Sequence, residues 1–128
     1  MSTSKFLLSW GMVLAYIVFN SVGALIIKYK INEMGTIQFS SFRFVIKYFY
    51  ELIKSPLIIC GIFSIFISAF VWMVALSRLQ ISIAYPVAVG LNFIVVVTVA
   101  LIFFKEHLSA EKIIGIVLIF ISVFLISR

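Results

Sequence analysis

The chain has 128 residues, of which 65% are hydrophobic and only 11% are charged, with a mean hydropathy of +1.31. A soluble domain of this length has too little interior to bury so much apolar surface, so the composition indicates an integral membrane protein. In that class, the net charge of +6 is explained by membrane orientation and contact with anionic lipid, and we expect no nucleic-acid partner.

Crossing a bilayer takes about 20 apolar residues. Four apolar runs approach or exceed this length: Phe6–Ile27, Pro56–Leu76, Ile81–Phe104 and Ile113–Ser127. The fourth run becomes long enough if its helix is capped by Ser109, because the Lys112 side chain can extend its charge to the interface. We therefore expect an all-α membrane protein in which residues 1–128 form a single domain of four transmembrane helices.

The segment between the first two runs is aromatic but too highly charged to cross a membrane. Its charged side chains recur at steps of four, four and three residues and so share one helical face: Arg43, Lys47, Glu51 and Lys54. This pattern predicts an amphipathic interfacial helix over about residues 38–54. Such a helix either anchors the bundle or binds an anionic lipid through its basic side.

The short turn SRLQIS at residues 77–82 predicts that the second and third membrane-spanning helices pack as antiparallel neighbours. The basic residues outside the spans divide unevenly between the two membrane sides. Seven lie on one side, and they are Lys28, Lys30, Arg43, Lys47, Lys54, Lys105 and Lys112. Lys5, Arg78 and Arg128 lie on the other side. The positive-inside rule therefore predicts cytoplasmic loops at the richer side and both termini outside.

A few polar and aromatic side chains fall inside the spans. Tyr16 and Asn20 are one turn apart on the first helix, Tyr85 and Asn92 are two turns apart on the third, and Trp72 lies deeper than an interfacial aromatic belt requires. These five residues are candidates for substrate binding. The two amides have two interpretations: bonds between helices, worth about 0.6–2 kcal/mol each, or hydrogen bonds to a polar substrate such as a sugar.

Small residues on the second helix share one face and predict close helix packing: Gly61, Ser64 and Ser68. All four acidic residues lie in loops or at helix ends, and they are Glu33, Glu51, Glu106 and Glu111. A proton-coupled exporter of cations ordinarily needs a carboxylate within the membrane, whereas Asn20 neither carries a proton nor balances a cation.

The sequence contains no pattern typical of an enzyme. There is one histidine, His107, and one cysteine, Cys60, so no metal-binding set of these residues is present. A nucleotide-binding P-loop is also missing. We expect no metal, no cofactor and no enzymatic activity.

The stretch ISIAYPVAVGLNF and the residues after it resemble the drug/metabolite transporter superfamily, in its small four-helix (EamA-like) branch. The IAYP start, the LNF triplet and the pair Lys105-Glu106 are similar to aminoarabinose–phosphoundecaprenol flippase subunits. The likeness to small multidrug resistance exporters is more distant. Aligned with those exporters, Asn20 stands where they carry their essential glutamate and Ala88 where they carry a binding tryptophan. Their fourth-helix dimer motif keeps Gly115, but Ser122 replaces its later glycine.

The resemblance implies a multi-pass protein of the bacterial inner membrane that helps translocate an undecaprenyl-phosphate-linked sugar for envelope modification. It also implies a homodimer, or a heterodimer with a paralogue. Asn20, Tyr85 and Asn92 would line the headgroup path. Lys28, Arg43 and Lys47 would contact the lipid phosphate. Two alternatives stay open, namely a proton-coupled multidrug or polyamine exporter and a membrane partner subunit that does not itself transport.

Overall fold

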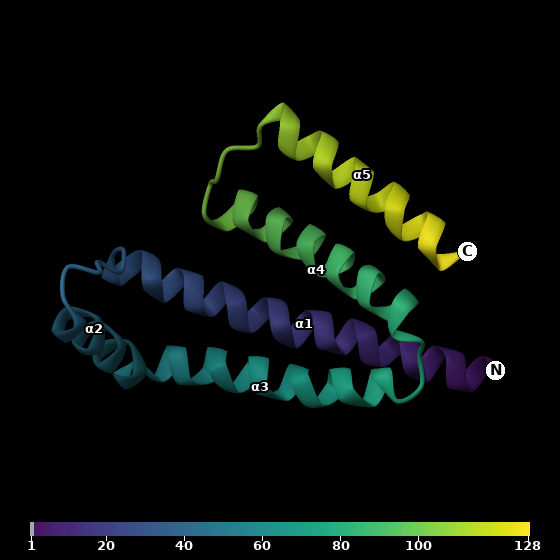
Figure 1. Ribbon diagram of the computed structural model, residues 1–128, viewed down its shortest axis with the longest axis horizontal. Helices are drawn as coiled ribbons and strands as arrows, with labels where there is room; N and C mark the ends of the chain where they lie inside the picture. Colours follow the sequence, from purple (N-terminus) through teal and green to yellow (C-terminus); the bar gives the residue numbers. More distant parts are fainter. Residues whose placement is uncertain (1) are drawn as a thin grey trace.

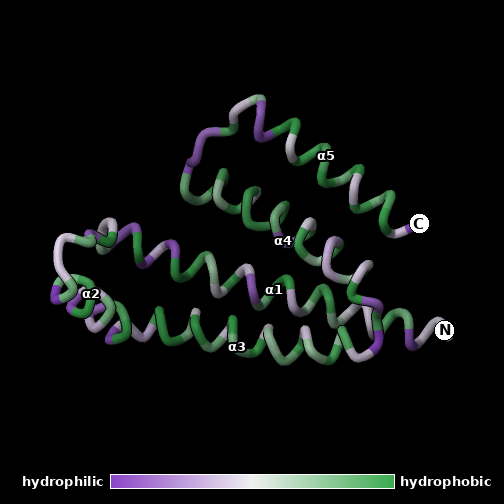
Figure 2. The backbone as a smooth tube through the Cα atoms, in the orientation of Figure 1, coloured by the Kyte–Doolittle hydropathy of each residue, from purple (hydrophilic) through white to green (hydrophobic). Residues whose placement is uncertain are grey.

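The computed structural model describes residues 2–128, which form five helices and no strand (Figure 1). The helices are α1 (Thr3–Met34), α2 (Phe42–Lys54), α3 (Pro56–Leu76), α4 (Ile81–Phe103) and α5 (Ala110–Ser127). All except α2 are long and apolar enough to cross a membrane. Figure 2 shows these four helices as largely hydrophobic, with hydrophilic segments mainly at their ends. The prediction of an all-α protein with four spans and a shorter helix after the first is confirmed, and the chain is a multi-pass membrane protein.

Local capping explains where the predicted boundaries shift. The interfacial helix α2 begins at Phe42 rather than near residue 38, because Ser41 has an extended backbone and its Oγ accepts a hydrogen bond from the Phe44 N–H at 3.4 Å. In the same way, the Ser109 Oγ accepts the Lys112 N–H at 3.3 Å, so α5 begins at Ala110.

The first helix extends beyond its apolar run at both ends. A helix of 32 residues is about 48 Å long, whereas the hydrocarbon layer of a bilayer is about 30 Å thick. The excess puts the last two turns of α1, from Lys28 to Met34, beyond the apolar run that crosses the membrane. Lys28 therefore lies at the interface, where its ammonium group can stay hydrated.

Two glycines allow α1 and α3 to approach closely. A Cβ atom built on Gly23 would lie 2.6 Å from the carbonyl oxygen of Gly61, and one built on Gly61 would lie 3.2 Å from that of Gly23. Beside this contact, the Ser64 Oγ donates a hydrogen bond to the Phe19 carbonyl oxygen at 2.7 Å. Close backbone approach, one hydrogen bond between helices and packing of the Ile65 side chain of α3 against Gly23 thus hold α1 against α3.

The second and third spans are antiparallel as expected, but the expectation that they are main packing neighbours is wrong (Figure 1). Helix α4 makes its main helix contacts with α1 and α5, and it runs in the same direction as α1 (Figure 1). The buried contact between these elements consists of Val13 and Ile17 of α1, Ala88 of α4 and Ala75 of α3. The short turn after α3 makes α3 and α4 antiparallel, but turn length does not decide which apolar face α4 covers.

The last helix forms the edge of the bundle. It contacts α4 at Gly90, where an added Cβ atom would lie 2.7 Å from the Val123 Cγ2. No residue of α5 is buried within the chain. Its outer surface is therefore open to lipid or to another protein subunit.

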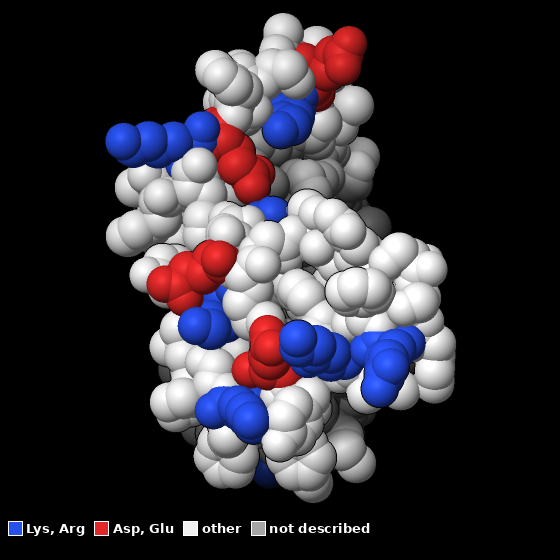
Figure 3. Space-filling view, turned by 90° about the vertical axis from the view of Figure 1, so that its left-hand side faces the viewer, with Lys and Arg blue, Asp and Glu red and all other residues white. Residues whose placement is uncertain are grey.

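The two loops rich in basic residues lie at the same end of the bundle, opposite both termini (Figure 1). This end contains α2 and the loop between α4 and α5. Figure 3 looks onto it and shows lysine, arginine and acidic side chains gathered on one face. The charge division expected from the sequence is therefore also a division between the two ends of the fold.

The glycine contact predicts a difference between two substitutions in α1. Gly23→Ala should weaken the α1–α3 packing by about 1–3 kcal/mol, because the new methyl group would overlap a backbone oxygen. Gly11→Ala is the matched control, since a Cβ atom there meets nothing within 4 Å. Thermal unfolding of the detergent-solubilised protein should show a lower midpoint for Gly23→Ala alone. Equal midpoints for the two variants would contradict the close approach.

Candidate substrate path along α1 and α4

Three polar side chains meet between α1 and α4, midway along the spans. The Ser21 Oγ donates a hydrogen bond to the Asn92 Oδ1 at 2.7 Å, and the Asn20 Nδ2 donates to the same oxygen at 3.4 Å. Ser21 is buried, whereas both asparagines are half-buried. The two candidate amides predicted from sequence are thus brought together, and they do bond one helix to the other.

The amides retain hydrogen-bonding capacity beyond this contact. Asn92 Oδ1 already accepts two bonds, but within residues 2–128 no partner is found for the Asn20 Oδ1 or for the Asn92 Nδ2. Because both side chains are partly exposed, that acceptor and that donor can reach a ligand or water. The same pair can therefore both bond the helices together and present polar groups to a substrate.

An aromatic cluster lies nearer the end that carries the termini. The Tyr16 and Trp72 ring centroids are 4.9 Å apart, and those of Trp72 and Tyr85 are 6.2 Å apart. These rings come from α1, α3 and α4, and the Tyr85 side chain is 56% exposed. All three predicted aromatic residues thus form one cluster, less than two turns from Asn20 and about two turns from Asn92.

A cavity of about 410 Å³ lies at the opposite end, between α1, α4 and the start of α5. We call it the charged cavity, because Lys28, Lys112 and Glu106 line it together with mainly apolar residues. The apolar lining consists of Ala24, Leu25, Phe93, Val96, Val97, Ala100, Leu101, Phe104 and Ile116. This lining combines three ionisable groups with a hydrocarbon-like wall.

The charged cavity continues the row of residues that contains the asparagine pair. On α1, the lining residue Ala24 is four positions after Asn20, and Lys28 follows four positions later. On α4, the lining residue Val96 is four positions after Asn92. Residues four apart are neighbours on a helix, and α1 and α4 run in the same direction. A row of positions therefore leads along both helices from the charged cavity to the asparagines.

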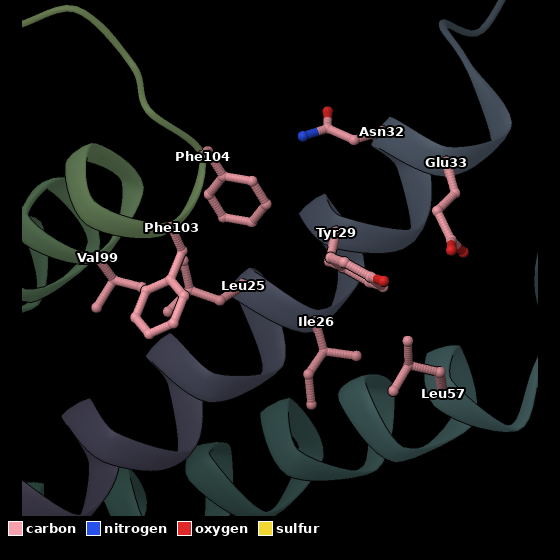
Figure 4. Close-up of a pocket in the computed structure, with 9 residues that line it drawn as sticks. All are labelled: Leu25, Ile26, Tyr29, Asn32, Glu33, Leu57, Val99, Phe103 and Phe104. Atoms are coloured by element: carbon pink, nitrogen blue, oxygen red, sulfur yellow. The ribbon is translucent and has the colours of Figure 1, made fainter.

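A larger cavity of about 720 Å³ adjoins the first and shares Leu25 and Phe104 with it. We call it the apolar groove. Figure 4 shows Phe103 and Phe104 facing α1, with Tyr29 toward the centre and Glu33 at the far end of α1. Glu33 is also paired with Lys30 at 3.0 Å. This groove offers apolar contact rather than a second charged site.

Other predicted residues lie away from this path. Arg43 and Lys47 are exposed on α2, which packs on α3, and neither lines the two cavities. The Ser68 Oγ bonds back to its own helix at the Ile65 carbonyl oxygen, at 2.6 Å. On α5, an added Cβ at Gly115 meets nothing within 4 Å, and the exposed Ser122 bonds to the Leu118 carbonyl oxygen of its own helix.

Sequence reasoning did not assign Ser21, Glu106 or Lys112 to the path. Ser21 belongs to an apolar stretch, and only the choice of α4 as the partner of α1 turns it toward Asn92. Lys112 was expected only to extend to the interface, and Glu106 only as part of the resemblance. A search for charged residues at the ends of neighbouring helices would have flagged both.

The four spans, with amides bonded between two of them, define a small multi-pass membrane protein of the transporter type. Residues 44–119, more than half of the chain, match the family described as Small Multidrug Resistance protein. The chain belongs to this family. No solved structure matches it at a significant level.

Several curated relatives carry a more specific name. A probable 4-amino-4-deoxy-L-arabinose-phosphoundecaprenol flippase subunit ArnE from Pseudomonas fluorescens is 30% identical over 78 residues, covering 61% of this chain and 68% of the relative. The corresponding probable subunit ArnF from Proteus mirabilis is 27% identical over 121 residues, covering 93% and 90%. A probable ArnE from Pseudomonas savastanoi is 40% identical over 58 residues, covering 45% and 50%. The resemblance stated from the sequence is confirmed by these matches.

The hydrogen bonds predict unequal effects of the two amides on stability. Asn92→Leu removes the acceptor for both Ser21 and Asn20, whereas Asn20→Leu removes only the longer bond. At about 0.6–1.7 kcal/mol for a bond between membrane helices, Asn92→Leu should lower the thermal midpoint more than Asn20→Leu. Unfolding scans of both variants in one detergent measure the difference. A larger loss for Asn20→Leu would contradict this bonding pattern.

Proposed function

We propose that the protein is a flippase subunit that translocates an undecaprenyl-phosphate-linked amino sugar across the bacterial inner membrane. The sugar headgroup moves along α1 and α4, while its polyprenyl chain stays in the lipid. The protein acts by binding and moving this substrate, not as an enzyme. The names of the relatives supply the substrate class, and the path along α1 and α4 supplies a physical route for a polar headgroup.

The observation that carries this proposal is the half-buried pair Asn20 and Asn92 on the row that leaves the charged cavity. The hydroxyl groups of a sugar need hydrogen-bond partners inside the membrane, and amides can donate to them and accept from them. In this proposal Tyr16, Trp72 and Tyr85 then receive the sugar near the far end of the path. Aromatic rings with a polar tip suit the apolar faces and hydroxyl groups of a sugar.

Two features favour this substrate over a cationic drug moved by proton exchange. All four acidic residues lie outside the apolar interior of the spans. In addition, Ala88 is only 1% exposed within the contact between α1, α3 and α4, so a binding tryptophan at this position would not fit without repacking. The exporter and the non-transporting subunit are the competing functions, and the transport experiment below separates them.

We also propose a dimer, either with a second copy or with a paralogous subunit, as the word subunit in the relatives' names suggests. Helix α5 is the natural contact element, because none of its residues is buried and the backbone at Gly115 is open to close approach. Ser122 lies farther along the same helix. Two copies would together enclose a path that one chain leaves open to lipid.

Replacement of Asn20 tests the path directly. Asn20→Leu should reduce translocation of a lipid-linked amino sugar by several-fold to about a hundred-fold, because the buried headgroup loses a hydrogen-bond partner. The measurement is the fraction of that lipid in proteoliposomes whose amino group reacts with an amine-reactive reagent that cannot cross the membrane. Thr98→Val is the matched control, since Thr98 is exposed and bonds to the Ile94 carbonyl oxygen of its own helix. Full specific activity with lowered stability in Asn20→Leu would restrict Asn20 to helix packing.

The uneven distribution of basic residues predicts the orientation. Arg43→Cys in a Cys60→Ser background should be protected from impermeant thiol reagents added to intact inner-membrane spheroplasts, because α2 is cytoplasmic in this proposal. Permeabilisation should then expose it. A cysteine replacing Ser2 should show the reverse pattern. Labelling of position 43 from outside in most molecules would invert the topology and place the charged cavity on the periplasmic side.

A further inference from the structure

We propose that the charged cavity is the site that loads the substrate, with Lys28 and Lys112 binding its phosphate and Glu106 binding the amino group of its sugar. This inference rests on the proposed function and goes beyond it. It assigns Glu106 and Lys112 to one end of the path and states which charged group of the substrate each residue binds. The ligand class is a polyprenyl phosphodiester whose headgroup carries a free amine.

The phosphate side of the site is formed by two helices. Lys28 comes from α1 and Lys112 from the first turn of α5, and both line the same cavity. The Lys112 Nζ donates to the His107 carbonyl oxygen at 3.0 Å, which orients its ammonium group and leaves two donors for a ligand. At the start of α5, the Lys112 N–H is already bonded to the Ser109 Oγ, and the Glu111 carboxylate lies in the same first turn. The two ammonium groups, rather than the helix end, therefore favour an anion here.

The group proposed to bind the amine, Glu106, lies in the loop directly after α4. Lys105 adopts a left-handed backbone with φ of 51°, which turns the chain back so that the Glu106 N–H bonds the Ala100 carbonyl oxygen at 3.4 Å. This turn brings Glu106 over the carboxyl end of α4, where the helix dipole is negative. A carboxylate and a negative helix end together favour a cation. The same cavity is thus lined by two ammonium groups and one carboxylate, which are the charges that a phosphate joined to an amino sugar requires.

The remaining lining selects a lipid over a free phosphate. Apart from the three ionisable residues, the cavity is lined by side chains such as Phe93, Leu101 and Ile116. These can contact the first isoprenoid units, and the adjoining apolar groove begins at the shared residues Leu25 and Phe104. Inorganic phosphate would satisfy the lysines but gain nothing from this surface.

Equilibrium binding to the full chain in phosphatidylcholine nanodiscs tests the site without any transport step. The probes are undecaprenyl phosphate, the same lipid carrying aminoarabinose, and that glycolipid with its amine N-acetylated. The double variant Lys28→Gln with Lys112→Gln should bind all three about ten-fold or more weakly, since both charge-assisted contacts are lost. Glu106→Gln should weaken only the lipid with the free amine, by about five-fold, as expected for a solvent-screened ion pair.

Lys54→Gln is the control, because it removes one positive charge from the same end of the bundle without changing a cavity-lining residue. It should leave all three affinities within about two-fold of the wild type. The assignment is overturned if Glu106→Gln weakens binding of the acetylated lipid as much as binding of the free amine, or if Lys54→Gln matches the double variant. Displacement of the lipid by inorganic phosphate at similar affinity would overturn the lipid specificity. Thermal midpoints of all variants verify that each is folded.

The failure of this site is distinguishable from failure of the proposed function. If the double variant translocates the glycolipid at the wild-type rate and binds it with wild-type affinity, the proposed loading site is wrong and the proposed flippase function is retained. If the wild type shows the expected binding pattern but no translocation alone or with a paralogue, the flippase is wrong and the binding site survives.

Discussion

The arrangement of this bundle depends on one constraint, which is that each polar group within the hydrocarbon layer needs a partner supplied by the protein. Several span hydroxyls satisfy it within their own helix, as Ser68 and Ser122 do. Ser64 and the pair Ser21 and Asn92 instead bond to a neighbouring helix. These contacts fix α1 against α3 on one side and against α4 on the other, so α1 becomes the helix on which the spans converge.

That central position gives α1 two different functions, which are rigid packing against α3 and presentation of polar groups toward α4. Gly23 brings its backbone against α3, which favours a rigid pair of helices. On the side toward α4, half-buried Asn20 leaves a hydrogen-bonding group available and leads to the charged cavity. A transporter needs both properties, because the helices that line the substrate path must be held in place by helices that pack rigidly. Helix α5, which contacts α4 and has no buried residue, leaves its outer surface to lipid or to the proposed second subunit.

The resemblance implies that Asn20 stands where the exporters of this family carry a glutamate, and an amide at that position would change what the scaffold can do. A carboxylate in the span binds a proton or a cation and so couples the two, at a high cost whenever it is charged and unpaired. Asn20 avoids this cost and gives up the coupling. The charges of this protein are concentrated at the end of the bundle instead, where water reaches them. This distribution suits a substrate whose charged headgroup binds near the membrane surface before it enters the path between the spans.

The sequence by itself determined the class, the four spans, the interfacial helix and the family resemblance, because hydropathy and helical periodicity are local properties of the chain. It also put Tyr16 with Asn20 and Tyr85 with Asn92, since residues on one helix have fixed spacing. It did not determine that α4 packs on α1 rather than on α3, because in a uniformly apolar helix no periodic pattern distinguishes one face from another. Only the tertiary structure decided that Ser21 meets Asn92 and that Lys28, Glu106 and Lys112 share a cavity, since those contacts depend on close approaches between residues far apart in the chain.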